Sequence, residues 1–172
     1  KIIKGGFIVK KLFAILVCGL MITVSGCGSN KSDNETTQSS QNVESKSVKD
    51  IYASVSAMAE GKLTELDPQY LSNYYGIDTT DLDEYVFAQS DTPESSAETI
   101  IIIKSADTSK FDSYKTSFEN YKKQKSQELT NYNLPDQAKL VDKSKVVEKG
   151  NYLYLVISEN ANEIIDTIEK NI

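Results

Sequence analysis

The sequence predicts an α+β fold, a mostly antiparallel sheet with helices packed on one face, in the order α-α-ββ-α-ββ-α. Residues 100–103 are an uninterrupted run of isoleucine, which is typical of a central strand buried on both faces. Two pairs of short apolar segments around polar turns predict hairpins. Segments with apolar residues at every third or fourth position lie before, between and after these pairs, and this spacing predicts helices.

The first part of the folded region predicts two helices. Ser47 is placed to be the N-cap of the first helix, which we expect to end at Gly61. A second helix is expected over residues 68–75, because an Asp-Pro pair begins it and Gly76 follows it. The apolar face of the first helix repeats at helical spacing: Val48, Ile51, Val55 and Met58.

The middle of the chain predicts a hairpin followed by helices. Residues 85–89 and 99–104 form the first strand pair, and the polar loop between them contains Pro93. The longest helix is expected over residues 109–129, where aromatic residues keep the helical period, and a short one over residues 136–141.

The last part predicts a second hairpin and a closing helix. Residues 145–148 and 152–158 flank the turn Lys149-Gly150-Asn151. Asn160 is placed as the N-cap of the last helix, with Glu163 three positions on. The apolar face of that helix is formed by Ile164, Ile165, Ile168 and Ile172.

The N-terminal region predicts an exported, lipid-anchored protein. Four lysines accompany an apolar run, residues 12–24, which is too short to span a hydrocarbon layer of about 30 Å as a helix. The sequence Val24-Ser25-Gly26-Cys27 then resembles the bacterial lipobox, whose cysteine receives a diacylglycerol and becomes the mature N-terminus. The alternatives are a cleaved signal with a chance cysteine, or an uncleaved membrane anchor.

This pattern divides the chain into three parts. Residues 1–26 are expected to be a lipoprotein signal peptide, residues 27–47 the lipidated cysteine and a flexible polar linker, and residues 48–172 a single α+β domain. As a coil the linker would span on the order of 25 Å. We therefore expect the protein on the extracytoplasmic face of a cell membrane, held by lipid through Cys27. Lysine without arginine, with many Ile and Asn residues, indicates a Gram-positive bacterium.

Composition excludes several kinds of chemistry. The chain has no His, Arg or Trp, and its two cysteines are Cys18, inside the expected signal, and Cys27. Imidazole bases, Ser-His-Asp triads and His- or Cys-ligated metals are therefore excluded, and no cofactor is expected. Once the expected signal is removed, 15 lysines face 25 acids, a formal net charge of −10. Such a charge repels nucleic acid, so we expect no nucleic-acid partner.

Several short motifs carry a family resemblance. They are residues 75–78, Lys104 after the isoleucine run, residues 132–137, Val146-Val147 and Gly150-Asn151-Tyr152. In this order and spacing they resemble the DUF4358 family, small bacterial lipoproteins or membrane-tethered proteins that carry a domain of unknown function. The resemblance extends over residues 48–172 and implies a lipoprotein-borne α+β module. It carries over no catalytic residues, because the family has no assigned activity.

Tyrosines are the candidate ligand-binding residues. Tyr70 and Tyr74 are an i,i+4 pair on the second predicted helix, and Tyr75 follows them. Exposed aromatic rings of this kind could stack on sugar rings or hold a peptide. Tyr152 and Tyr154 share one strand face opposite a leucine pair, and one of these faces could be partly exposed. The alternative is that the tyrosines pack onto the sheet with their hydroxyls at its rim.

The acids do not predict a catalytic or metal site. The densest cluster comprises Asp78, Asp81, Asp83 and Glu84, and its spacing does not match an EF-hand loop, so solvated acids at helix starts explain it more simply. No spacing selects the two facing carboxylates that glycan hydrolysis requires. We therefore expect a non-enzymatic surface lipoprotein with a small domain that binds an envelope protein or a small extracellular ligand. The alternative is a carboxylate-dependent cell-wall hydrolase.

Overall fold

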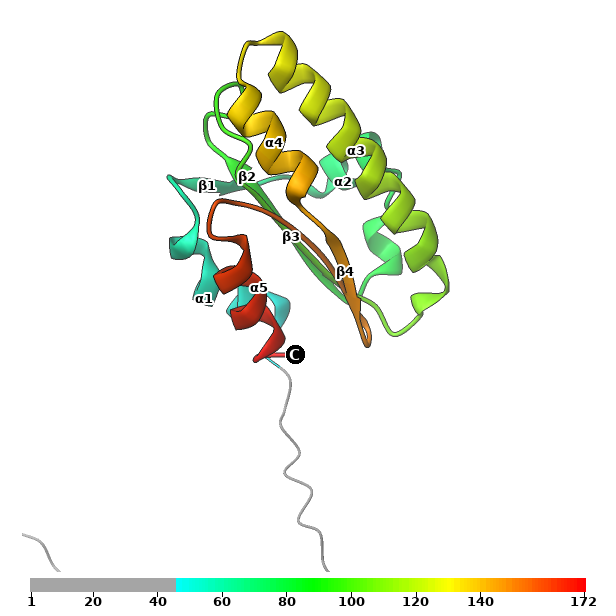
Figure 1. The fold of residues 1–172 in the computed structure, drawn as a ribbon. Coiled ribbons are helices and arrows are strands. Elements are labelled where there is room, and N and C mark those ends of the chain that lie inside the picture. The colour runs from blue at the N-terminus through cyan, green and yellow to red at the C-terminus, as the bar shows by residue number, and fades with distance from the viewer. Residues whose placement is uncertain (1–45) are drawn as a thin grey trace, which may run out of the picture. The chain divides into compact units, whose positions relative to one another are not determined.

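The computed structural model describes residues 46–172 (Figure 1). The predictions of a signal peptide, of lipidation at Cys27 and of most of the linker fall on residues 1–45 and lie outside the described residues. Over the described range the predicted α+β class is confirmed, since the chain forms one antiparallel sheet of five strands together with five α-helices.

The sheet has the strand order β1-β2-β3-β5-β4, and every neighbouring pair is antiparallel. The predicted hairpins are β2–β3 and β4–β5, and β3 and β5 pair in the middle, with Ile101 opposite Leu155. The strands are β1 (Leu63–Glu65), β2 (Glu84–Ser90), β3 (Thr99–Lys104), β4 (Val146–Lys149) and β5 (Tyr152–Ile157).

The helices agree with the sequence pattern in type, and α2 also agrees in its bounds, whereas the other helices differ at their ends. They are α1 (Val48–Val55), α2 (Pro68–Tyr75), α3 (Phe111–Asn131), α4 (Pro135–Lys143) and α5 (Ala161–Glu169), with short 3-10 turns at Ser56–Met58, Thr79–Asp81 and Thr108–Lys110. The backbone N–H of Asp50 donates to the Ser47 hydroxyl at 3.1 Å, which confirms Ser47 as the N-cap of α1. However, α1 ends at Val55 and not at Gly61.

The helices cover both faces of the sheet, whereas the sequence analysis expects them on one face. α2, α3 and α4 cover one face, called the α3 face below, and α1 and α5 cover the other, called the α1–α5 face (Figure 1). Ile101 and Ile103 of β3 belong to the core of the α3 face, and Ile100 and Ile102 to the core of the α1–α5 face. All four are fully buried. Burying such a side chain contributes about 1.5–3 kcal/mol, so a central strand of this composition is stable only with helices on both sides.

The sequence pattern does not predict the first strand, β1. β1 is only three residues long and pairs with the end of β2, with Leu63 opposite Ser90. No helix within residues 46–172 combines the length and the apolar character that crossing a membrane requires.

Candidate functional site

A tyrosine-lined cleft of about 190 Å³ lies between α2, α3 and the loop that joins β2 to β3. We call it the tyrosine cleft. Three of its lining residues are the tyrosines predicted from the α2 segment, Tyr70, Tyr74 and Tyr75, and the opposite wall is formed by Tyr121 and Lys125 of α3. The structure therefore brings together three of the four candidate tyrosines.

Local sequence signals fix the helix that carries these tyrosines. The Asp67 carboxylate accepts a hydrogen bond at 2.9 Å from the backbone N–H of Gln69, and Pro68 opens α2 with its preset φ. At the other end Gly76 adopts φ +63°, and its N–H donates to the carbonyl of Ser72 at 3.1 Å. α2 is thus held at both ends by capping residues that lie directly beside it in the sequence.

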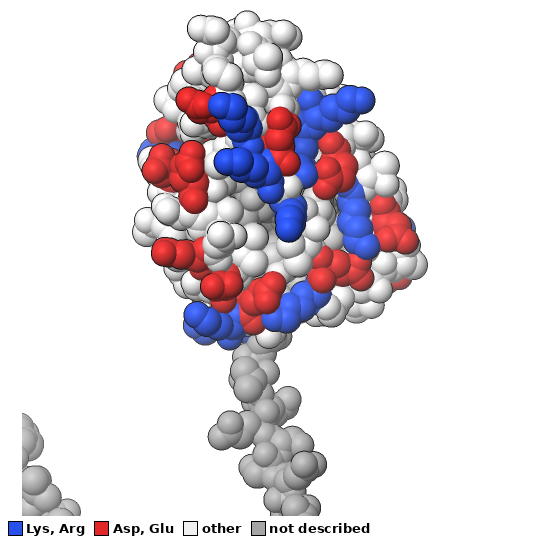
Figure 2. All heavy atoms as spheres, in the orientation of Figure 1, with Lys and Arg blue, Asp and Glu red and all other residues white. Residues whose placement is uncertain are grey.

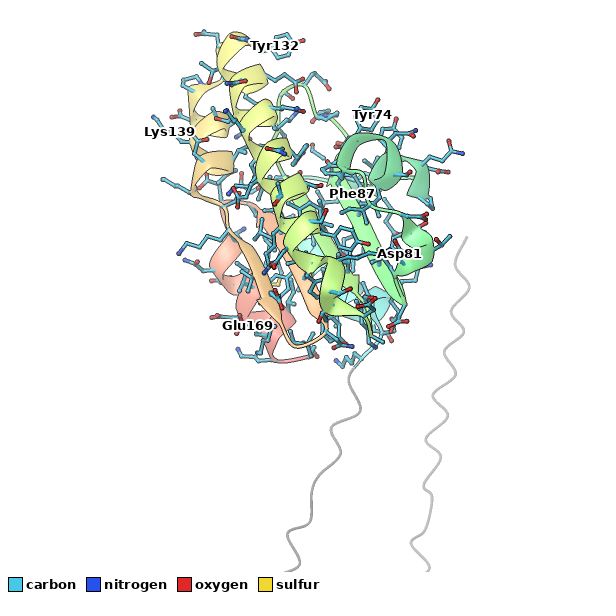
Figure 3. All side chains as sticks on the ribbon, turned by 90° about the vertical axis from the view of Figure 1, so that its right-hand side faces the viewer. Tyr74, Asp81, Phe87, Tyr132, Lys139 and Glu169 are labelled. Atoms are coloured by element: carbon cyan, nitrogen blue, oxygen red, sulfur yellow. The ribbon has the colours of Figure 1, made fainter. Side chains whose placement is uncertain are left out.

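The outer part of the cleft is a stacked pair of exposed rings. Tyr70 and Tyr74 lie one helical turn apart, with ring centroids 5.3 Å apart and an interplanar angle of 16°. Tyr74 is 71% exposed and Tyr70 is 43% exposed. Figure 3 shows Tyr74 on α2 at the surface of the molecule. Two large aromatic rings are therefore presented to solvent beside a cleft.

The floor of the cleft is a buried aromatic cluster. The ring of Tyr75 meets Phe87 of β2 edge to face, with centroids 5.0 Å apart, and lies 4.9 Å from the ring of Tyr121. Burial first, and then the neighbouring Tyr121, raise the pKa of the Tyr75 phenol far above its ordinary value. Burial also raises the pKa of Tyr121. Both hydroxyls are therefore neutral hydrogen-bonding groups at physiological pH.

Lys125 closes one side of the cleft. Its Nζ donates to the carbonyl oxygen of Pro93 at 2.8 Å, which holds the β2–β3 loop against α3. The same Nζ lies 3.5 Å from the carboxylate of Glu128, so the positive charge inside the cleft is matched by a negative one. Gln89 and Gln124 add uncharged amide groups to the lining.

Tyr152, the fourth candidate, does not reach this cleft. It belongs to the core of the α1–α5 face, on the other side of the sheet, and is 3% exposed. The Nζ of Lys104 lies 5.5 Å from the centre of its ring, and Lys104 also pairs with Glu84 at 2.7 Å. Both strand faces of β5 are buried, so neither of its alternating pairs is exposed, although strand alternation alone allows one of them to be.

Each of the dense acids, which lie between α2 and the first residue of β2, has a partner in the fold. Asp78 accepts from the backbone N–H of Thr80, the carboxylate of Asp83 accepts from the N–H of Ala106, and that of Glu84 from the N–H of Val48. Asp81 forms a 2.6 Å ion pair with Lys110. Among the described side chains, no group of three or more His, Cys, Asp or Glu residues is arranged to hold a metal ion.

A larger hollow, of about 480 Å³, opens between α4 and the start of α5. Lys139 and Lys143 stand on its rim with Asp136 and Glu159, and Lys139 pairs with Asp136 at 3.1 Å. Figure 2 shows positive and negative side chains interspersed around uncharged surface on this side of the molecule. None of the residues that line the hollow is aromatic. The charges of this hollow compensate one another, and it has no aromatic group to anchor a ligand. The tyrosine cleft is therefore the better candidate.

The cleft also contains residues that sequence reasoning missed. Phe87, Tyr121 and Lys125 come from β2 and α3, distant in sequence from α2. In the sequence Tyr121 marks only the apolar face of the long helix, and Lys125 only a basic residue near that helix's end. No local signal distinguishes them, since their role depends on how α3 crosses the sheet.

Comparison with known proteins gives one match. A family model described as "Domain of unknown function (DUF4358)" matches residues 55–158, which is more than half of the chain and includes every residue that lines the tyrosine cleft. No curated protein and no solved structure matches the chain.

Proposed function

The chain belongs to the DUF4358 family, a domain of unknown function, and we propose that it is a lipid-anchored extracytoplasmic binding protein whose domain takes its ligand in the tyrosine cleft. The proposal has two parts, anchoring through the N-terminal segment and binding through the folded domain, and each is supported by a separate observation.

The anchoring part is supported by the sequence of residues 1–27. A basic segment, a short apolar run and small residues before Cys27 occur together and in order. A diacylglycerol on Cys27 would supply two acyl chains, and two chains hold a protein stably at a membrane where one does not. The polar residues that follow Cys27 would then place the domain at a distance from the lipid headgroups.

The binding part is supported by one observation, the exposed and stacked pair Tyr70–Tyr74 at the mouth of a cleft with an aromatic floor. A Tyr74 ring that is 71% exposed contributes little to folding, because most of its surface remains in water. The same ring is well suited to binding, since tyrosine offers a large rigid contact area and loses little conformational entropy. Tyr75 and Tyr121 make the floor rigid by packing into the core.

We propose binding without turnover. Hydrolysis by two carboxylates requires a second acid that faces the first across the substrate. Glu128 is the one acid among the residues that line the tyrosine cleft, and it pairs with Lys125. A polymer or small ligand held in the cleft would therefore meet aromatic and amide groups and one compensated ion pair.

Cosedimentation of the full chain with purified cell-wall fragments tests the binding part. We expect the wild-type protein to sediment with the fragments and Tyr74→Ala to remain largely in the supernatant. Tyr74→Phe is the matched control, because it keeps the ring and should keep most of the binding. Circular dichroism would verify that each variant is folded. If Tyr74→Ala and a Tyr70→Ala/Tyr74→Ala double variant sedimented like the wild type, the tyrosine cleft would not be the binding site.

A further inference from the structure

The tyrosine cleft continues into a second hollow along α3. This hollow has a volume of about 430 Å³, and Gln124 and Glu128 line it as well as the cleft. The remaining lining residues are Gln127, Asn131 and Tyr132. Because the two hollows share a wall, they form one groove, which we call the α3 groove.

The spacing of the lining residues shows that the groove is elongated. Gln124, Glu128 and Asn131 lie at positions i, i+4 and i+7 of α3, which places them on one face of the helix. With a rise of 1.5 Å per residue this stripe is roughly 10 Å long. Tyr74 of α2 stands at the end of the groove that the tyrosine cleft forms, and Tyr132, which is 63% exposed, stands at the other end, just after the C-terminal end of α3 (Figure 3). An extended ligand would contact both ends, whereas a compact one would fill a single hollow.

The side chains of the groove have a distinctive chemistry. Two kinds of group line most of it, flat tyrosine rings and uncharged carboxamides, the latter from Gln124, Gln127 and Asn131. A carboxamide offers two N–H donors and one carbonyl acceptor without a charge. The one lysine and the one acid of the groove, Lys125 and Glu128, compensate each other at 3.5 Å. The groove therefore fits a neutral ligand that is apolar on one side and rich in hydrogen-bonding groups at its rim.

We propose that the α3 groove binds a neutral glycan chain. This inference rests on the proposed function above and names its ligand class. A sugar ring presents C–H groups on its faces, which are attracted to the negative face of a tyrosine ring, and hydroxyls around its edge, which exchange hydrogen bonds with carboxamides. Tyr74 would hold one sugar ring and Tyr132 another, and the amides between them would set the orientation of the chain.

Other polymers fit the groove less well. An extended peptide gains its affinity by adding a strand to an open sheet edge, but the groove runs along α3, whose backbone is bonded within the helix. An anionic polymer would be repelled by Glu128 and by the chain as a whole. The formal net charge of the chain is −10 once the expected signal is removed. A proline-rich peptide, which docks between aromatic rings, is the remaining competitor, and the experiment below includes it.

The test is saturation-transfer NMR on the full chain in detergent, with chitotetraose and cellotetraose as neutral glycan probes and a decaproline peptide as competitor. We expect a tetrasaccharide to receive magnetisation from tyrosine ring protons and to bind more tightly than the corresponding monosaccharide. Tyr74→Ala should weaken the affinity for the tetrasaccharide by on the order of tenfold, and Tyr74→Phe should weaken it much less. Gln124→Ala should also weaken binding, whereas Gln69→Ala, an exposed glutamine of α2 outside the groove, should not.

The outcomes separate the ligand class from the proposed function. Binding of a tetrasaccharide that is sensitive to Tyr74→Ala and to Gln124→Ala supports the inference. If wall-fragment binding depends on Tyr74 but neither tetrasaccharide binds, or only decaproline binds, the glycan assignment is overturned while the cleft remains a binding site. If Tyr74→Ala changes neither wall-fragment binding nor the binding of any probe, both the glycan assignment and the proposed site are overturned.

Discussion

At the scale of single residues, the fold accommodates two ionisable side chains in its interior in different ways. Lys122 of α3 is 9% exposed, and its Nζ donates to the carbonyl oxygen of Ser144 at 2.7 Å while it also contacts the Glu119 carboxylate. Glu98, the residue before β3, is 2% exposed. One of its oxygens accepts from the N–H of Glu159 at 3.3 Å, and the other has no hydrogen-bond partner among the described residues.

The bond from Lys122 leads to a prediction about stability. Lys122→Met keeps the length of the side chain but leaves the carbonyl of Ser144 without its donor, so the free energy of unfolding should fall by roughly 1–3 kcal/mol. Urea unfolding followed by circular dichroism measures the loss. Lys123→Met is the control, because Lys123 is the exposed neighbour on the same helix. Equal losses in the two variants would show that the buried bond contributes nothing.

Glu98 leads to a prediction about pH. Burial is the main cause that raises the pKa of its carboxyl group, and the negative charge of Glu60 adds to it, while hydrogen bonds from Ser158 and Glu159 act the other way. The folded protein therefore keeps this proton at pH values where the unfolded chain has lost it. Stability from this group is then present below the ordinary carboxyl pKa and is lost as the pH rises through the raised value.

Replacing Glu98 with a side chain that cannot ionise should remove that decline. Urea unfolding at a series of pH values from about 4 to about 8 should show that Glu98→Gln keeps more of its stability at the upper end than the wild type does. Glu163→Gln, a change at an exposed acid of α5, should follow the wild-type curve. Parallel pH curves for Glu98→Gln and the wild type would contradict the assignment of the decline to Glu98.

At the scale of elements, helices and strands that have local sequence signals are predicted well, whereas elements that depend on pairing between distant segments are not. The bounds of α2 agree with the sequence analysis because Asp67 and Gly76, which cap it, lie beside it in the chain. Residues 99–104 are correctly predicted as a strand because their β-branched run is itself a strand signal. β1 is missed because three residues carry no periodicity, and it exists only through its pairing with β2.

The placement of the helices on both faces follows from the same isoleucine run. Residues 100–103 indicate a strand buried on both sides, and this requires helices on both sides, so the expectation of one covered face conflicts with the strand signal itself. Which helix covers which face cannot be taken from local pattern, because α1 and α5 share one face although they lie at opposite ends of the described sequence.

The residues of the candidate site also divide into those that local sequence could group together and those that it could not. Tyr70, Tyr74 and Tyr75 could be grouped from the sequence because they share one short helix. Tyr152 could not be excluded, since strand alternation separates two faces without telling which is covered. The α3 wall of the cleft, with Tyr121 and Lys125, depends on the crossing of α3 over the sheet and has no signal in the local sequence.

The C-cap of α2 allows a test of this element. Gly76 has φ +63° and nothing within 4 Å of an added Cβ, so Gly76→Ala should cost roughly 1–2 kcal/mol through backbone strain alone. Gly150, in the β4–β5 turn, has φ +61° and equally open space, so Gly150→Ala should cost a similar amount. Urea unfolding would compare the two losses.

Of these two changes, only Gly76→Ala should affect binding in the tyrosine cleft. Because Gly76 ends the helix that carries Tyr74 and Tyr75, Gly76→Ala should weaken cosedimentation with wall fragments beyond its effect on stability. Gly150→Ala should leave cosedimentation unchanged under conditions where both variants are folded. If the two variants bound equally well, the C-cap of α2 would not determine the position of the tyrosines.

At the scale of the whole molecule, the tyrosine cleft and the first described residue, Lys46, lie on different sides of the sheet. The backbone N–H of Lys46 donates to the carbonyl of Asn171 at 3.4 Å, so the first described residue lies beside the C-terminal end, next to α1 and α5 (Figure 1). The cleft lies on the α3 face, across the sheet. The first described residue and the tyrosine cleft therefore lie on opposite faces of the sheet.

The final prediction concerns that tether and separates the two cysteines of the chain. If a diacylglycerol on Cys27 holds the protein, Cys27→Ala should move it from the membrane pellet to the soluble or unprocessed fraction, because each buried methylene contributes about 0.8 kcal/mol and both acyl chains are lost together. Cys18→Ala changes a cysteine inside the expected signal and should leave the protein in the pellet. Fractionation followed by immunoblotting, with globomycin to block processing of the precursor, measures both effects. Membrane retention of Cys27→Ala, with processing unaffected by globomycin, would show that the chain is held in another way and would remove the basis for an extracytoplasmic, lipid-anchored protein.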